Sequence, residues 1–175
     1  MDLLDFEPAD LYFDEPIDPS VEALIRQAGE TYPDPRAGSM LAEAEALAPE
    51  NLMVMVAQYR YFYYRHQFSD ALVVADRALA TTARRLNLPQ DWQELTPADV
   101  ANKTENAPTL LRFHLLTLKG AAYLFLRLGL HEAGLARLDK LRELDSADRL
   151  GADALAKTVR ASLTPEPLEG DPHAG

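Results

Sequence analysis

The sequence contains no cysteine, and it has only four histidines and five serines among 175 residues. Without cysteine the chain can form no disulfide framework and no thiolate metal site, and it has no thiol nucleophile. The histidines are scattered, and neither a Gly-rich phosphate loop nor a serine elbow motif is present. A recognisable nucleophile–base pair, metal set or phosphate cradle is therefore missing. We expect no catalytic residue, no metal and no cofactor, and an enzyme is the remote alternative.

Long apolar runs are also missing. No stretch of 18 apolar residues occurs, and the acidic N-terminus lacks the basic and then apolar pattern of a signal peptide. The sequence therefore predicts no membrane partner and a cytoplasmic protein.

Both ends of the chain lack basic residues. Residues 1–20 hold seven acids and residues 165–175 hold three, whereas the other 18 acids face all 17 Lys and Arg residues. The net charge of −11 thus belongs to the ends. A nucleic-acid partner is disfavoured, because phosphate contacts need a concentrated basic surface. Residues 1–19 are expected to be an acidic flexible leader, and residues 164–175 a flexible tail. Phe6, Tyr12 and Phe13 leave a docking motif open as the alternative for the leader.

The most regular pattern runs from Leu115 to Asp148 and predicts two helices separated at Leu128-Gly129. Gly129 permits a tight reversal, because glycine takes a positive φ without steric cost. Small residues, including Gly134, stand where the two helices must approach closely. Both helices carry one apolar stripe with helical spacing: Leu118, Ala121, Ala122 and Phe125 in the first, and Leu135, Leu138, Leu141 and Leu144 in the second. Such a hairpin cannot bury its apolar face alone and needs neighbours.

The neighbours follow from a spacing of 34 residues. Gly134 corresponds to Ala71 after one unit and an insertion of 29 residues, and Ala71 corresponds to Ala37 one further unit back. A period of this size marks stacked repeats, in which each unit covers the apolar face of the next. Three units fit the sequence, at residues 18–51, 52–85 and 115–148, with the insertion at 86–114.

These units resemble the tetratricopeptide repeat (TPR) family. The third unit carries the resemblance best, through Leu128-Gly129, Gly134 and the leucines after it. The second unit departs from the family at His66, where glycine is preferred. The resemblance implies an all-α fold over residues 20–163: a TPR-like α-α superhelix of three helical hairpins, an inserted segment, and a C-terminal capping helix at about 148–163. Small acidic TPR-like proteins also occur beside nitrogen-fixation genes in bacteria.

Local signals give the helix boundaries. Ser20 and Asn51 are expected N-caps, and Thr96-Pro97-Ala98-Asp99 predicts the start of a short helix. Trp92 is expected to anchor the insertion against the repeats, with ligand stacking as the alternative. The remaining helices are expected at about 21–31, 35–47, 51–66, 69–86, 106–128 and 132–144.

One helix carries five aromatic residues and two arginines between Gln58 and Arg65. In the TPR-like arrangement one face of each first helix lines a concave groove, so the sequence predicts a basic and aromatic protein-binding groove. Tyrosine and arginine often dominate interface energetics, although ordinary surface is the alternative. Glu22 and Val56 do not match the carboxylate clamp of chaperone-binding TPR proteins. The predicted groove residues are Arg26, Arg60, Tyr63, Tyr64, Lys119, Tyr123 and Arg127.

The sequence therefore predicts a non-catalytic protein–protein interaction module that binds an acidic and apolar peptide segment. The alternatives are a dedicated chaperone or assembly factor for one client, and an architectural subunit. A further hypothesis is that residues 2–17 fold back into the groove of the same chain or of a second copy. The protein is expected to be a monomer or a weak dimer.

Overall fold

The computed structural model describes residues 16–163. The expected tail, and the expected leader up to residue 15, lie outside the described residues. Within residues 16–163 every regular element is helical and no strand is present, which confirms the all-α expectation. The elements are α1 (Pro19–Thr31), α2 (Arg36–Leu47), α3 (Leu52–Tyr64), α4 (Phe68–Leu86), a 3₁₀ turn η1 (Trp92–Glu94), α5 (Pro97–Asn106), α6 (Pro108–Arg127), α7 (His131–Leu144) and α8 (Ala152–Leu163).

Two of the expected N-caps are confirmed and one is wrong. The Asn51 side chain accepts hydrogen bonds from the first backbone N–H groups of α3. Thr96 and Asp99 form a capping box, in which the Thr96 N–H donates to Asp99 Oδ2 at 2.9 Å. α1, however, is capped by Asp18 instead of Ser20, and Asp18 Oδ1 accepts from the Ser20 N–H at 2.8 Å. Pro19 explains this shift, because proline suits the first helical position and moves the cap to the residue before it.

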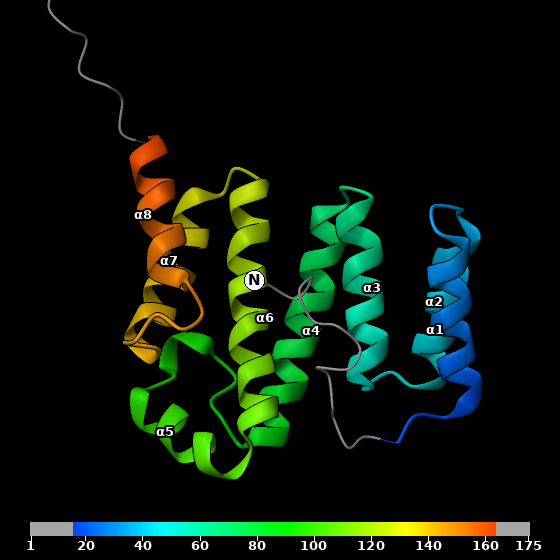
Figure 1. Cartoon of the computed structure of the whole chain (residues 1–175), viewed down its shortest axis with the longest axis horizontal. Helices are drawn as coiled ribbons and strands as arrows, with labels where there is room; N and C mark the ends of the chain where they lie inside the picture. Colours follow the sequence, from blue (N-terminus) through cyan, green and yellow to red (C-terminus); the bar gives the residue numbers. More distant parts are fainter. Residues whose placement is uncertain (1–15, 164–175) are drawn as a thin grey trace, which may run out of the picture.

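Neighbouring helices pack in chain order across the molecule (Figure 1). The pairs α1–α2, α3–α4 and α6–α7 each form a hairpin, α4 lies against α6, and α5 contacts α6 and α7. α8 covers α7, and Arg160 of α8 binds Asp139 of α7 at 2.6 Å. No helix among residues 16–163 is both long and apolar enough to span a bilayer.

Small residues lie at the closest point of each hairpin, as the spacing predicts. Ala37 and Ala71 are fully buried, and Gly134 is buried between α6 and α7. A Cβ atom at Gly134 would come within 2.7 Å of Leu126 Cγ and 2.9 Å of the Ala122 carbonyl oxygen. The third hairpin can therefore close only around glycine in its present geometry.

The turns after α3 and α6 have the same geometry, 63 residues apart. His66 has φ of 58° and Gly129 has φ of 77°, so both residues lie in the left-handed region. Each turn closes with the same six-residue hydrogen bond: the Gln67 N–H donates to the Phe62 carbonyl, and the Leu130 N–H to the Phe125 carbonyl, both at 2.9 Å. This backbone pattern is a Schellman C-cap. The second and third hairpins are thus equivalent in the backbone as well as in sequence spacing.

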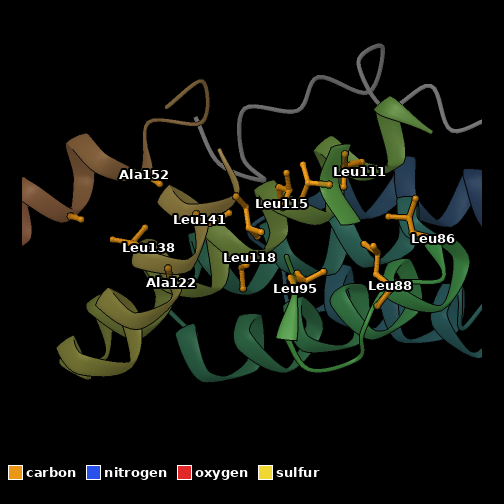
Figure 2. Close-up of a cluster of buried hydrophobic side chains, with 14 residues drawn as sticks. Leu86, Leu88, Leu95, Leu111, Leu115, Leu118, Ala122, Leu138, Leu141 and Ala152 are labelled. Carbon is orange, nitrogen blue, oxygen red and sulfur yellow. The ribbon is translucent and has the colours of Figure 1, made fainter. Parts of the chain in front are cut away.

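Two large core clusters hold the repeats together. One joins α3, α4 and α6 around Tyr59 and Phe113. The other joins α5, α6, α7 and α8 around leucines such as Leu118 and Leu138, as Figure 2 shows. Trp92 is half-buried and packs against this second cluster, which is the position expected of an anchor for the insertion.

Candidate interaction surface

Four tyrosines form a continuous row across the C-terminal ends of α1, α3 and α6. Tyr32 lies directly after α1, Tyr63 and Tyr64 end α3, and Tyr123 is in the last turns of α6. Ring centroids are 6.4 Å apart for Tyr32 and Tyr64, 5.6 Å for Tyr64 and Tyr63, and 6.2 Å for Tyr63 and Tyr123. We call these four residues the aromatic row. Because each belongs to the first helix of a hairpin or to the residue after it, the row crosses all three units.

Arg127 closes the row at the α6 end. Its guanidinium carbon lies 4.5 Å from the Phe68 ring centroid and 5.8 Å from that of Tyr123. Its Nη1 also donates a hydrogen bond to the Tyr123 hydroxyl at 3.3 Å, and this bond raises the pKa of Arg127. Between residues 16 and 163 no carboxylate forms an ion pair with Arg127. A permanently charged cation, held by aromatic rings instead of an acid, is therefore presented at the surface.

A cleft of about 320 Å³ lies between α1 and α3, next to the aromatic row. Its floor is mostly apolar, and Arg60 and Tyr64 supply polar groups. The cleft can take an apolar or aromatic side chain of a partner with a polar group directed at Arg60. The lining residues are Ile25, Ala28, Gly29, Tyr32, Leu41, Met53, Val56, Ala57, Arg60, Tyr61 and Tyr64.

Five of the seven predicted groove residues belong to the aromatic row, to Arg127 at its end or to the cleft. They are Arg60, Tyr63, Tyr64, Tyr123 and Arg127.

The other two predicted residues differ from the expectation. Arg26 is exposed on α1, where it pairs with Glu30 at 3.1 Å and does not line the cleft. Lys119 is buried, and its ammonium group donates a hydrogen bond to the Leu150 carbonyl at 2.6 Å, so it contacts the loop between α7 and α8. The helical register placed Lys119 on the predicted face, but that loop folds over it.

Two contributors were not predicted as site residues. Tyr32 stands one repeat unit of 34 residues before His66, at the turn, and only the approach of α1 to α3 brings its ring to Tyr64. Phe68 begins α4 and supports Arg127 from below the aromatic row. The repeat spacing could have indicated Tyr32, because it is the first-unit equivalent of a residue at the end of the aromatic helix.

The only histidine buried in the described part is His114, which lies on α6 facing α4. Its Nδ1 lies 2.7 Å from the Thr82 hydroxyl, which itself donates to the Ala78 carbonyl, so the imidazole donates through Nδ1–H. Burial lowers the pKa of His114 to about 4, so the ring is neutral at physiological pH. Among residues 16–163, no three His, Asp or Glu side chains are grouped to bind a metal ion.

The chain is similar to a protein of Azotobacter chroococcum mcd 1 named "Uncharacterized 19.8 kDa protein in nifW 5'region". The two sequences are 48% identical over 155 residues, which cover 89% of this chain and 86% of the relative. The chain belongs to the same family as this bacterial protein. No family model and no solved structure matches the chain.

Proposed function

We propose that the protein is a TPR-like superhelix that binds an acidic and apolar peptide segment of a partner protein. The observation that carries this proposal is the aromatic row with Arg127 at its end. Aromatic rings and arginine are the groups that most often dominate binding energy at protein interfaces. The equivalent turns at His66 and Gly129 support a superhelical stack, because they repeat one hairpin geometry at the repeat spacing.

The expected affinity follows from the size of the site. Two aromatic side chains of a partner that each bury about 150 Å² would contribute about 7 kcal/mol of favourable transfer free energy. A carboxylate at Arg127 adds about 0.2–1 kcal/mol, because Arg127 is exposed. Loss of translational and conformational freedom opposes these terms. Binding in the micromolar range, about −8 kcal/mol, is the expected balance once backbone contacts are included.

To test this proposal, binding segments are selected from a displayed library of peptides and measured by fluorescence anisotropy. The selected segments should combine acids with large apolar residues. Their affinity should fall at least tenfold for Tyr64→Ala/Arg127→Ala. A control variant, Leu47→Ala/Arg36→Ala, changes equally exposed side chains of α2 and should bind like the unchanged chain. Equal affinity for the two variants would rule out the aromatic row as the binding site.

A second candidate function is a dedicated assembly factor for one client protein. The observation that favours it is the name of the Azotobacter relative, which refers to the 5′ region of nifW and fits the expected association with nitrogen-fixation genes. Affinity isolation of the tagged full chain from its own cells distinguishes the two functions. One client at constant stoichiometry supports an assembly factor, whereas several substoichiometric proteins support an adaptor.

A further inference from the structure

We propose that residues 2–15 of the same chain occupy this surface, running along α3 and placing aromatic side chains on the aromatic row. The inference rests on the proposed function, since it uses the same surface. It names the first ligand of that surface as an internal segment that an external partner must displace.

The described chain enters the fold beside α3. Ile17 packs with Val21 of α1, Ala44 of α2 and Val54 of α3, and Asp18 then caps α1. Residues 2–15 therefore begin next to the first turn of α3. Figure 1 shows that α1 and α3 start at the same end of the molecule, so α3 leads from this entry point to the aromatic row.

The segment is long enough to reach the aromatic row. α3 has 13 residues and is about 20 Å long. Fourteen extended residues span about 45 Å, so residues 2–15 cover this distance even when part of the segment is helical. No other element has to move to make room for the segment at its start.

The chemistry of the segment complements the surface. Residues 2–15 contain six acids and no base, together with Phe6, Tyr12 and Phe13. The surface offers the Arg127 cation, which no carboxylate of residues 16–163 pairs, and Arg60 in the cleft. The apolar cleft of about 320 Å³ accepts an aromatic ring. Acids and aromatic residues alternate in the segment, as a ligand of an aromatic and basic surface requires.

Tethering makes a weak contact sufficient. A short flexible connection gives an effective concentration on the order of millimolar. A segment that binds as a free peptide with Kd of about 100 µM would then be bound in about nine molecules of ten. An external partner would bind about tenfold more weakly than to an open surface, so the segment sets a threshold for partner binding.

The absence of cysteine allows a direct test with the full chain. A nitroxide label on Ala9→Cys is unique, because the sequence contains no other thiol. At dilutions where the protein is monomeric, the label should broaden the amide NMR signals of Tyr63, Tyr64 and Tyr123. The same label in an Arg60→Glu/Arg127→Glu background should lose most of this broadening. A matched background, Arg36→Glu/Lys157→Glu, changes the charge equally at exposed ion pairs away from the aromatic row and should keep it.

The outcomes separate this inference from the proposed function. Broadening confined to residues adjacent in sequence to the label, such as Pro19 and Ser20, overturns the inference. Broadening that appears only when labelled chains are mixed with isotope-labelled, unlabelled-thiol chains also overturns it, because the segment then binds a second copy. Equal broadening in both charge-reversal backgrounds overturns the role of the arginines and with it the inference. In each case the anisotropy experiment with selected peptides still decides whether the surface binds an external segment.

Discussion

Replacing Gly134 tests whether the third hairpin is closed around a glycine. In the structure a Cβ at this position meets Leu126 Cγ at 2.7 Å, Leu126 Cδ2 at 2.8 Å and the Ala122 carbonyl oxygen at 2.9 Å. The leucine can rotate, but the carbonyl belongs to the backbone of α6. Gly134→Ala therefore forces α6 and α7 apart, and overpacking of this kind costs about 1–3 kcal/mol.

Helix propensity opposes this cost and must be separated from it. Alanine in place of a helical glycine gains up to about 1 kcal/mol. Gly29 in α1 provides the matched control, because a Cβ there meets nothing within 4 Å. Gly29→Ala should stabilise the protein by about 0.5–1 kcal/mol. The difference between the two substitutions then reports the overlap alone, and we expect it to be about 1–3 kcal/mol.

The assay is urea unfolding of both variants and the unchanged chain, with thermal unfolding as a second measurement. In a chain of this size each kcal/mol moves the Tm by about 2–4 °C. Gly134→Leu should cost more than Gly134→Ala, because a larger side chain enters the same gap. If Gly134→Ala stabilises as much as Gly29→Ala, the close crossing of α6 and α7 is wrong.

Three further predictions concern other parts of the fold. Trp92→Ala should destabilise the protein by about 2–3 kcal/mol, less than for a fully buried tryptophan, because the ring is half-buried and loses its contact with the Arg137 guanidinium at 4.8 Å; unchanged unfolding would contradict this. Thr96→Ala should cost about 0.5–2 kcal/mol by removing the capping box, measured by urea unfolding. His114 should make stability fall by about 2 kcal/mol between pH 7 and pH 5, because the unfolded side chain takes up a proton near its ordinary pKa of 6.5, whereas burial holds the folded pKa at about 4. This loss begins as the pH falls through 6.5 and is complete below 4, and His114→Gln should remove it from the stability profile.

The helices and their pairing could be predicted because their signals are local or periodic. The apolar stripes of Leu118 and Leu138 repeat with helical spacing, and both residues are fully buried. Ala71 and Gly134 mark the crossings at the repeat distance. The cap of α1 was misplaced by two residues, because Asp18 and Ser20 are both good caps and only the position of Pro19 decides between them.

The candidate surface was predicted less completely, because it depends on contacts between distant segments. The aromatic helix was evident from sequence, and its Tyr63 does meet Tyr123 of α6. The partner ring at Tyr32 comes from a turn, where the helical register gives no direction for a side chain. Lys119 shows the opposite failure: its register is that of a groove residue, yet the loop that reaches Leu150 buries it. Nothing in the spacing of that loop indicates where it folds.

Site-specific photo-crosslinking is the most direct test of the claim that the aromatic row binds a peptide segment. A photoreactive amino acid replaces Tyr64 in one full-length variant and Leu47 in the other, two side chains that are 55% and 57% exposed. We predict that irradiation in the cells of origin yields covalent adducts with a polypeptide segment, external or from residues 2–15, at position 64 and not at position 47. Equal adduct yields at the two positions, or adducts at position 47 alone, would contradict the account.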